Sequence, residues 1–222
     1  MKVLITGGAG YIGSHMALSL LDEGNEVVIL DNLSTGFKNL IPKKSIFIEG
    51  DIENLDLVNK LLCEYNFDAV AHFSGSIKVE ESVSDPFKYY ENNAFKTLKF
   101  INLLSKSNTK NLIFSSTAAV YGLSNKELIS ESTPLNPINP YGSSKLMCER
   151  MIQDLSKSSN LKFFILRYFN VVGSESKINC GIVDKKSKQL FANINRSIIK
   201  KENKVSVYGS DYPTKDGTCI RD

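Results

Sequence analysis

Residues 2–13 read KVLITGGAGYIG, a short apolar run followed at once by a glycine-rich turn. Gly7, Gly10 and Gly13 form the pattern GxxGxxG, and an amphipathic stretch over residues 11–23 overlaps its end. In such a turn the first glycine permits the tight bend, the second lets the backbone approach a pyrophosphate, and the third lets the helix pack closely on the strand. The N-terminal end of the following helix is positively polarised and would point at the phosphates. Because a strand pattern precedes the turn and a helix pattern follows it, these residues predict a dinucleotide-binding site.

Five further apolar runs follow along the chain, and longer helical stretches separate them. The six runs span residues 2–6, 26–30, 45–49, 69–73, 111–115 and 162–166. Most are nearly continuous in apolar residues, which is typical of parallel strands covered on both faces. Apolar side chains at three-to-four spacing after Pro86 and after Pro140 indicate helices. This alternation predicts an α/β fold with a doubly wound Rossmann-type parallel sheet.

The alternation of strands and helices stops beyond Asn170. A helical pattern runs through residues 190–198, and a short apolar run at 205–208 favours a strand. We therefore expect one nucleotide-binding domain over residues 1–170. Residues 171–222 are expected to form the incomplete start of a smaller C-terminal substrate domain.

Composition narrows the class of protein. Of the 222 residues, 42% are hydrophobic and 23% charged, as in ordinary globular domains. A net charge of +3 is too small to indicate nucleic-acid binding. The four cysteines form no CxxC pair and the two histidines have no ligand-like pattern around them, so we expect reduced thiols and no metal. The first apolar run is broken at once by glycines and is neither a signal peptide nor a membrane span, so we expect a cytoplasmic protein without a membrane partner.

An acidic residue at the end of the second apolar run bears on the choice of dinucleotide. Asp31 lies 18 residues beyond Gly13, where a carboxylate binds the hydroxyls of the adenosine ribose. A role as a turn or helix-cap residue is the alternative. Because a carboxylate there repels a 2′-phosphate, NAD is expected rather than NADP. Asp51 and Ile52 follow the third run, and we expect them at the edge of the adenine.

A second group of residues predicts the chemistry. Tyr141 and Lys145 form a YxxxK pattern, and a spacing of four places both side chains on one face of a helix. A phenol is a poor base at neutral pH, but a nearby ammonium and a positively charged nicotinamide would favour the phenolate. Thr117 follows the fifth apolar run and offers a hydroxyl to bridge Tyr141 and a substrate oxygen. Ser115 and Ser116 compete with Thr117 for this role.

Short segments spread along the chain resemble a known family in sequence and in order. They are GGAGYIGSH (7–15), DN (31–32), GDI (50–52), HFSGS (72–76), YYENN (89–93), SSTAAVYG (115–122), PYGSSK (140–145), RYFN (167–170) and YGSDYPTKDGTCIRD (208–222). Over essentially its whole length the chain is similar to the extended short-chain dehydrogenase/reductase family, and within it to the UDP-glucose 4-epimerases. The last segment resembles the epimerases rather than the dehydratases of the same superfamily.

The resemblance implies which residues contact the ligands. For NAD it implies Gly7, Gly10, Tyr11, Ile12, Gly13, Asp31, Asn32, Asp51, Ile52, Phe73, Asn92, Lys145 and Tyr168. For catalysis it implies Thr117, Tyr141 and Lys145. For the UDP-sugar it implies Thr117, Tyr141, Asn170, Gln189, Leu190, Tyr208 and Arg221. The guanidinium of Arg221 would pair with the diphosphate. Residues 1–170 would then be the NAD-binding domain and residues 171–222 part of the UDP-sugar-binding domain.

The resemblance also implies a reaction. Tyr141, helped by Thr117, would take the proton from the sugar 4-hydroxyl while hydride passes to NAD. The 4-keto sugar would turn within the site and take the hydride back on its other face. UDP-glucose and UDP-galactose would interconvert in this way, and NAD would be regenerated.

Two alternatives to this reading stay open. One is a related nucleotide-sugar epimerase or dehydratase, although the segment Thr117-Ala118-Ala119 lacks the carboxylate pair that a dehydratase needs. The other is a chain that binds NAD without turnover, because related epimerases continue beyond the position of Asp222. The second alternative predicts that the 222 residues bind NAD but epimerise UDP-galactose weakly or not at all. The sequence leaves open the acceptance of N-acetylated sugars and the formation of a homodimer.

Overall fold

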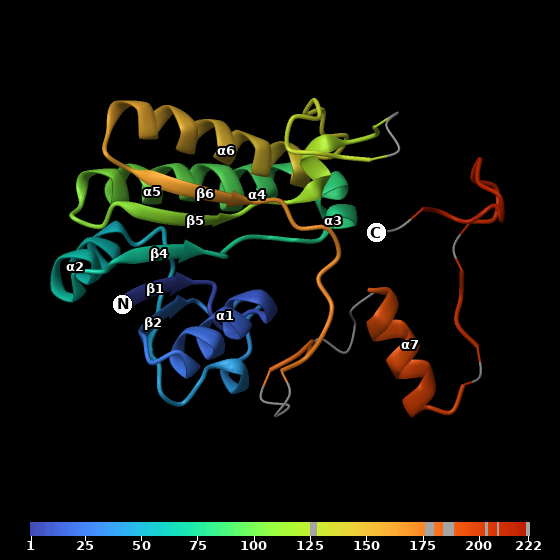
Figure 1. The fold of residues 1–222 in the computed structure, drawn as a ribbon, viewed down its shortest axis with the longest axis horizontal. Helices are drawn as coiled ribbons and strands as arrows, with labels where there is room; N and C mark the ends of the chain where they lie inside the picture. Colours follow the sequence, from blue (N-terminus) through green and yellow to red (C-terminus); the bar gives the residue numbers. More distant parts are fainter. Residues whose placement is uncertain (125–127, 176–179, 184–188, 203, 208, 221–222) are drawn as a thin grey trace. The chain divides into compact units, whose positions relative to one another are not determined.

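The computed structural model describes the chain except for residues 125–127, 176–179, 184–188, 203, 208 and 221–222 (Figure 1). The chain divides into two compact units, Met1–Phe169 and Asn170–Asp222. Within the described ranges, all of the strands belong to the first unit. None of the helices described is both long enough and apolar enough to cross a membrane.

All six predicted strands form in the first unit, with ends that differ from the prediction by at most one residue. The strands are β1 (Lys2–Thr6), β2 (Glu26–Asp31), β3 (Ile46–Glu49), β4 (Ala69–His72), β5 (Asn111–Ser115) and β6 (Lys162–Leu166). The helices between them are α1 (Tyr11–Asp22), α2 (Leu55–Tyr65), α3 (Val79–Ser84), α4 (Pro86–Tyr89), the π-helical segment η2 (Tyr90–Phe95), α5 (Lys96–Lys106) and α6 (Pro140–Ser158), with short 3-10 helices η1 (Lys38–Leu40) and η3 (Ala118–Tyr121).

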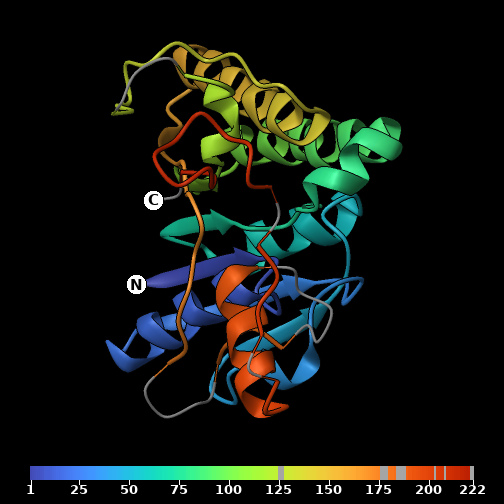
Figure 2. The ribbon, with the colours of Figure 1, turned by 90° about the vertical axis from the view of Figure 1, so that its right-hand side faces the viewer.

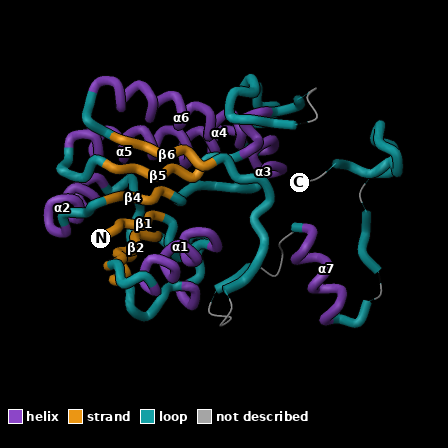
Figure 3. Tube along the Cα trace, viewed as in Figure 1, coloured by secondary structure: helices purple, strands orange, loops and turns teal. Residues whose placement is uncertain are grey.

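The six strands pair in parallel in the order β3-β2-β1-β4-β5-β6 (Figure 3). This order is that of a Rossmann-type sheet, which confirms the predicted fold class. The direction of winding reverses between β1 and β4. The connections that leave these two strands therefore diverge, and a crevice opens at their carboxyl ends, where such sheets bind ligands.

Alternating residues of the inner strands supply a separate core on each face of the sheet. One core contains Leu4, Val28, Leu30, Val70, Leu112 and Phe114 packed with α2, α5 and α6. The other contains Val3, Ile5, Val27, Ile29 and Ala71 packed against α1. The ribbon shows α1 on the opposite side of the sheet from α5 and α6 (Figure 2). Burial of each Val, Leu, Ile or Phe side chain in these cores contributes about 1.5–3 kcal/mol to the stability of the fold. Both faces of the inner strands are therefore covered by apolar packing.

The expectation that the strands are covered on both faces is wrong for β6. Phe164 lies beside Ile113 of β5 in the register, yet its side chain is 74% exposed. On this face α1 contacts β1 and β2, which are far along the sheet from β6. Phe164 therefore keeps its ring in contact with water although its neighbours along the sheet are packed.

The second unit contains α7 (Leu190–Ile199), which confirms the predicted helix. The predicted strand at 205–208 is wrong as far as the structure describes it, because residues 205–207 form no strand and Tyr208 lies outside the described residues. Val207 is 72% exposed. A strand needs a neighbour to accept and donate its backbone hydrogen bonds, and the described part of this unit provides no such neighbour.

His72 lies in the core at the end of β4 and is completely buried. One ring nitrogen, Nδ1, shares a hydrogen bond with the Thr6 hydroxyl at 2.6 Å, and the other, Nε2, with the Thr97 hydroxyl at 3.0 Å. Burial lowers the pKa of the imidazole from 6.5 to about 3, and the positive charge of Lys145 acts in the same direction. The ring is therefore neutral and serves to tie β1, β4 and α5 together.

The buried neutral state of His72 predicts how stability depends on pH. The unfolded chain binds a proton at His72 below its ordinary pKa of 6.5, whereas the folded protein does so only near 3. The free energy that this group contributes is thus fully present above pH 6.5 and is lost as the pH falls, by about 1.4 kcal/mol per pH unit. Urea unfolding at several pH values should show His72→Gln with a shallower loss of stability on acidification than the unaltered protein. Equal slopes in the two proteins would contradict this assignment.

Candidate active site

The ligand crevice begins at the glycine-rich turn after β1. Gly7 has a φ of +72°, and a Cβ there would lie 2.6 Å from the backbone nitrogen of Ser74, just past β4. A Cβ on Gly13 of α1 would collide with the carbonyl oxygen of Gly7. The first position therefore needs a left-handed backbone and the second needs close packing of helix on turn, and glycine satisfies both. The turn thus has the geometry that lets backbone and helix N-terminus approach a pyrophosphate.

Asp31 is held against this turn at the end of β2, where its side chain is nearly buried. Its Oδ2 accepts a hydrogen bond from the backbone nitrogen of Ala9 at 3.0 Å, and its Oδ1 accepts one from Leu33 at 2.8 Å. The bond from the Leu33 backbone nitrogen shows that Asp31 also stabilises a turn, which was the alternative to a role in ribose binding. The bond to Ala9 fixes the carboxylate beside the glycine-rich turn, as binding to a ribose on a bound dinucleotide requires.

Asp51 and Ile52, predicted at the adenine edge, lie just beyond β3, and Asn32, predicted to contact NAD, lies beside them beyond β2. Asn32 donates from Nδ2 to Asp51 Oδ2 at 2.7 Å, and Lys96 of α5 lies 3.2 Å from the same oxygen and 3.0 Å from Glu53 Oε2. Burial raises the pKa of Asp51, but bonds from the Glu53 amide, Asn32 and Lys96 outweigh it, so the pKa lies below its usual value. Ile52 is buried at their side. The predicted contacts form one ordered, charged patch.

Helix α6 presents Tyr141 in its first turn. Pro140 occupies the first helical position, and the Asn139 side chain accepts a hydrogen bond from Gly142 N at 2.8 Å. These are favourable residues for starting a helix, because proline needs no amide partner there and asparagine satisfies an otherwise unpaired one. A helix that starts at this residue places Tyr141 at the end of the sheet that carries the crevice.

Two side chains of α6 contact the end of β5 and the residues that follow it. The Thr117 hydroxyl lies beside the Tyr141 hydroxyl, close enough to lower the pKa of the phenol. The Lys145 ammonium donates to the carbonyl oxygen of Ser115 at 2.9 Å and lies 5.0 Å from the centre of the Phe114 ring. Thr117 in turn accepts a hydrogen bond from Ala119 N at 3.1 Å, which leaves its proton to be donated to Tyr141. The structure therefore brings the three predicted catalytic residues together.

Burial dominates the acid–base properties of this group. It raises the pKa of the Tyr141 phenol, while the hydrogen bond from Thr117 acts in the opposite direction. It also lowers the pKa of the Lys145 ammonium. In the protein by itself, burial outweighs the effect of Thr117, so the pKa of Tyr141 lies above its ordinary value, and Lys145 donates to the Ser115 carbonyl. The expectation that the ammonium and a positively charged nicotinamide together favour the phenolate stays a prediction.

The structure bears on the choice between Thr117 and its two neighbours. The Ser116 hydroxyl donates to the carboxylate of Glu149 and is 3% exposed, so it is turned away from Tyr141. Ser115 contributes its carbonyl oxygen to Lys145. The geometry therefore favours Thr117 as the partner of Tyr141.

The other residues predicted to contact NAD lie around the same crevice. Phe73 follows β4, and its backbone nitrogen donates to the carbonyl oxygen of Thr6 at 2.9 Å. Asn92 lies in the π-helical segment and donates to the Ser76 hydroxyl at 3.0 Å. Tyr168 follows β6, and burial raises the pKa of its phenol. Gly10 caps α1, and the helix begins with Tyr11 and Ile12.

The residues predicted to contact the sugar nucleotide alone belong to the second unit. Asn170 is exposed at its start, Gln189 precedes α7, and Leu190 is the first residue of that helix. Tyr208 and Arg221 lie outside the described residues. These five assignments stay predictions from the resemblance.

Sequence reasoning missed several buried residues that hold the catalytic segment. Asn93 accepts a hydrogen bond from Ser76 N at 2.7 Å, donates to Ser144 Oγ at 3.2 Å and is 2% exposed. Tyr89 is fully buried, and its ring lies edge-on to that of Tyr141 with 6.3 Å between the centres. Their segment was noted only for its resemblance, and no local pattern indicates which of its polar residues are buried. Within the described residues there is no cluster of three or more His, Cys, Asp or Glu side chains placed to hold a metal.

The sheet order, the glycine-rich turn and the Thr117–Tyr141–Lys145 group together define a dinucleotide-dependent enzyme of the short-chain dehydrogenase/reductase class. The model of the NAD-dependent epimerase/dehydratase family matches residues 3–222. The chain belongs to this family, which confirms the resemblance and the prediction of NAD as the cofactor.

Individual relatives and solved structures agree with the family. The chain is 46% identical over 222 residues to a UDP-glucose 4-epimerase of Lactobacillus helveticus, covering 100% of this chain and 67% of the relative. A UDP-glucose 4-epimerase of Azospirillum brasilense is 42% identical, with 100% and 64% covered. The structure of a UDP-glucose 4-epimerase from Brucella ovis in complex with NAD has a TM-score of 0.90 at 39% identity, with 98% of this chain and 67% of that one covered. The chain thus spans about two thirds of the length of these relatives.

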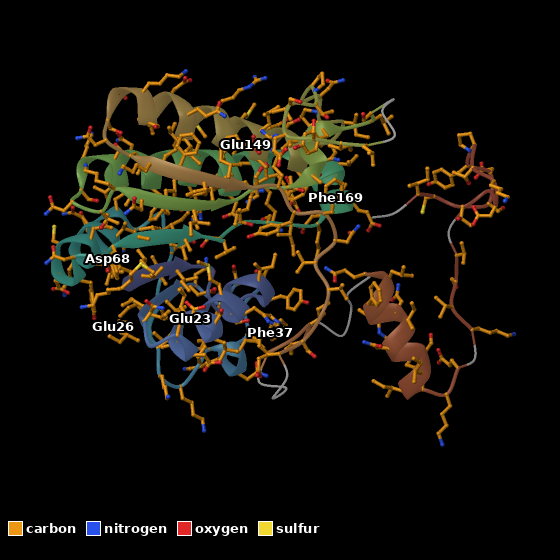
Figure 4. The ribbon with its side chains drawn as sticks, in the orientation of Figure 1. Glu23, Glu26, Phe37, Asp68, Glu149 and Phe169 are labelled. Carbon is orange, nitrogen blue, oxygen red and sulfur yellow. The ribbon has the colours of Figure 1, made fainter. Side chains whose placement is uncertain are left out.

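Asp31 predicts the selectivity for the dinucleotide. NAD should bind more tightly than NADP by a factor of roughly ten or more, because a carboxylate beside the ribose repels a 2′-phosphate. Asp31→Asn should narrow this ratio, since the amide can still accept the bond from Ala9 but carries no charge. Fluorescence titration with both dinucleotides measures the ratio. Asp68→Asn is the matched control, because Asp68 precedes β4 at the amino ends of the strands, away from the crevice (Figure 4). Tighter binding of NADP than NAD by the unaltered protein would contradict the prediction.

Proposed function

We propose that this protein catalyses the NAD-dependent 4-epimerisation of UDP-glucose and UDP-galactose. The observation that carries the proposal is the placement of the Thr117 hydroxyl beside Tyr141 just after β5, on the same edge of the sheet as the glycine-rich turn. An acid–base phenol placed there suits oxidation of a hydroxyl beside a dinucleotide. Relatives named as UDP-glucose 4-epimerases supply the substrate class.

The residues of the first unit fit a bound NAD. Gly7 and Gly13 admit the pyrophosphate at the start of α1, Asp31 takes the ribose, and Asp51 with Ile52 borders the adenine. Lys145, fixed at the Ser115 carbonyl, would contact the nicotinamide ribose. NAD, when bound, supplies a hydride acceptor and donor together with a positively charged ring.

Tyr141 moves the proton in the proposed reaction. Its phenolate accepts the proton of the sugar 4-hydroxyl and later returns one to the 4-keto sugar, which is reduced on its other face. Thr117 donates a hydrogen bond to the phenol oxygen and so offsets part of the cost of ionising a buried group. The positive charge of the bound cofactor favours the phenolate further.

We propose that the second unit contributes to the UDP-sugar site through Asn170, Gln189, Leu190, Tyr208 and Arg221. A guanidinium at position 221 would suit the diphosphate. Relatives also include a probable UDP-arabinose 4-epimerase of Arabidopsis thaliana, 43% identical, of which the chain covers 57%. A structural neighbour from Campylobacter jejuni is a UDP-Glc/GlcNAc 4-epimerase with a TM-score of 0.82 at 40% identity. The range of UDP-sugars is therefore a point for experiment.

A second candidate function is NAD binding without turnover by these 222 residues. The observation that favours it is coverage, because about a third of each relative lies outside the match. Sugar contacts supplied by that third in a relative would not come from residues 1–222. Positioning contributes a large share of catalysis, so partial clamping of the sugar nucleotide would slow the reaction severely.

We also propose a cytoplasmic protein that forms a homodimer. The structure has no disulfide between the four cysteines, as is usual in a reducing compartment. An open, largely apolar groove lies between η2, α5 and α6, lined by Tyr90, Ala94, Phe95, Leu98, Met147, Arg150 and Met151. Glu91, next to Tyr90 in the sequence, is exposed, so a two-fold pairing of this face would offer each copy an apolar surface and a carboxylate as a partner for Arg150.

Replacement of the phenol tests the proposed chemistry. Tyr141→Phe should lower kcat for UDP-galactose by roughly 10²–10⁴, the range for loss of a positioned acid–base group. NAD affinity should be unchanged, since the ring keeps its place beside Tyr89. A coupled assay of UDP-glucose formation measures kcat, and fluorescence measures NAD binding.

Tyr65→Phe, at the end of α2 where the ring lies 5.8 Å from the ammonium of Lys2 at the start of β1, shows the effect of the same chemical change away from Tyr141. Near-normal turnover in Tyr141→Phe would exclude Tyr141 as the acid–base group. If the unaltered polypeptide of 222 residues binds NAD but turns over no UDP-galactose, the second candidate function is the correct one.

The dimer has its own test. Light scattering should give twice the chain mass of 24.7 kDa for the unaltered protein. Leu98→Glu, which places a charge in the apolar groove, should give the single-chain mass, whereas Val83→Glu on the exposed surface of α3 should not. A single-chain mass for the unaltered protein at micromolar concentration would refute the homodimer.

A further inference from the structure

A buried ion pair lies on α6 beyond the catalytic residues. Glu149, labelled in Figure 4, is 1% exposed. It follows Tyr141 and Lys145 at a spacing of four, so the three residues share one face of the helix. Arg167, just after β6, donates from Nη2 to Glu149 Oε2 at 2.7 Å and from Nε to the two carboxylate oxygens at 3.1 and 3.2 Å. The pair is bidentate and charge-assisted, the strongest class of protein hydrogen bond. The proposed chemistry makes no direct use of it.

This ion pair holds the chain on both sides of Thr117. Before it, the Ser116 hydroxyl donates to Glu149 Oε1. After it, the Tyr121 hydroxyl accepts from Arg167 Nη1 at 3.0 Å, and the guanidinium lies 5.1 Å from the centre of the Tyr121 ring. Thr117 lies between these two anchors and is the N-terminal cap of the helical turn that contains Tyr121.

The backbone nitrogen of Ala119, which donates to the Thr117 hydroxyl at 3.1 Å, fixes the Thr117 side chain relative to its own turn but not relative to α6. Ser116 N donates to the carbonyl oxygen of Leu166 at 2.8 Å, and Ala118 N donates to that of Tyr168 at 2.7 Å. These bonds set the path of the main chain along β6. The bond from the Ser116 side chain to Glu149 adds a constraint on rotation of the segment, because it ties one side chain of the segment to α6.

A need for stability would not by itself account for a buried ion pair at this place. Well-packed apolar residues of similar volume often serve stability as well or better, because two charges must lose their water. What the charged pair supplies, and apolar packing does not, is direction. The same helix face carries Tyr141, the group that Thr117 contacts, so a bond from this face to Ser116 sets the distance between the two hydroxyls.

We propose that Glu149, held by Arg167, is a positioning residue that orients the Thr117 hydroxyl toward Tyr141 by fixing Ser116. The inference rests on the proposed function for its meaning in catalysis, but the orientation itself is a property of these residues. Removal of the Ser116–Glu149 bond leaves the segment free to move relative to α6, and the Thr117 hydroxyl moves away from the Tyr141 hydroxyl.

The charge state of Tyr141 reports this orientation. The bond from Thr117 lowers the pKa of the phenol against the effect of burial, so its loss should raise the pKa. The titratable groups that adjoin Tyr141 in the described structure are Tyr89 of α4, edge-on at 6.3 Å, and Lys145 on the next turn of α6. Neither group is bonded to Ser116, Glu149 or Arg167, so their influence should be the same in the variants.

Two variants remove the constraint in different ways. Ser116→Ala deletes the bond to Glu149 and leaves the Glu149–Arg167 pair intact, so the protein should fold. The double variant Glu149→Leu with Arg167→Met replaces the pair by apolar side chains of similar volume and leaves no unpaired buried charge. Ser105→Ala is the matched control, because it removes a buried serine hydroxyl bonded to Asn102 on α5, away from the site.

Two readouts apply to each protein. The first is titration of the Tyr141 phenol by NMR with ring-labelled tyrosine, assigned by the signal missing in Tyr141→Phe. The second is the pH profile of kcat. In both variants the phenol pKa should rise, and kcat at neutral pH should fall by about 10², the scale of a small misplacement of a catalytic group. In the two variants, KM for UDP-galactose and the affinity for NAD should not change, and the loss of kcat should be smaller at higher pH. In the control Ser105→Ala, the phenol pKa and the pH profile of kcat should both be unchanged.

The outcomes separate the inference from the proposed function. Variants that lower the unfolding temperature but leave the Tyr141 pKa and the kcat profile unchanged would show that the pair only stabilises the fold. An equal rise of the pKa in Ser105→Ala would also overturn the inference. If the unaltered protein does not turn over UDP-galactose and the phenol pKa still rises in both variants, the proposed function fails and the orientation of Thr117 by Glu149 stands.

Discussion

The close approach of the chain after β1 to the chain after β4 is the constraint on which the rest of the structure depends. Gly7 adopts a left-handed backbone there and packs against the backbone of Ser74, which no side chain at position 7 would allow. This contact lies where the strand order reverses, so the helices that follow the two strands go to opposite faces of the sheet. The crevice, the direction of α1 and the place of Asp31 beside the turn all follow from it.

Helix α6 organises the chemical half of the site. Its face toward the sheet carries Tyr141, Lys145 and Glu149 at intervals of one turn, and these contact Thr117, Ser115 and Ser116 respectively. A regular helix beside a regular strand holds three different polar groups in fixed register, without relying on a loop. Such a support suits acid–base chemistry, in which small displacements of the reacting groups have large effects on rate.

Burial sets the charge states in this part of the protein. It lowers the pKa of His72, which is therefore neutral, and it lowers the pKa of Lys145. It raises the pKa of Tyr141 and so opposes ionisation of the phenol. The Thr117 hydroxyl acts against burial at Tyr141 by lowering the pKa of the phenol. Under the proposed function, the positive charge of bound NAD would favour the phenolate further and so link the chemistry to cofactor binding.

The sequence by itself determined the six strands of the first unit and their class of fold, a Rossmann-type parallel sheet. It also determined the residues of the glycine-rich turn and of the YxxxK pair. These features are local, since apolar periodicity, glycine spacing and a four-residue helical interval can all be read within short windows. Only the tertiary structure decided that Glu149 is buried, because a glutamate within a helix looks like a solvated charge until a serine 33 residues away and Arg167 are packed against it. It also decided that Thr117 rather than Ser116 faces Tyr141, that Phe164 on the outer strand stays exposed, and that residues 205–207 form no strand. Each of these depends on which distant groups are available to cover a face, accept a proton or pair with a backbone, and no local pattern contains that information.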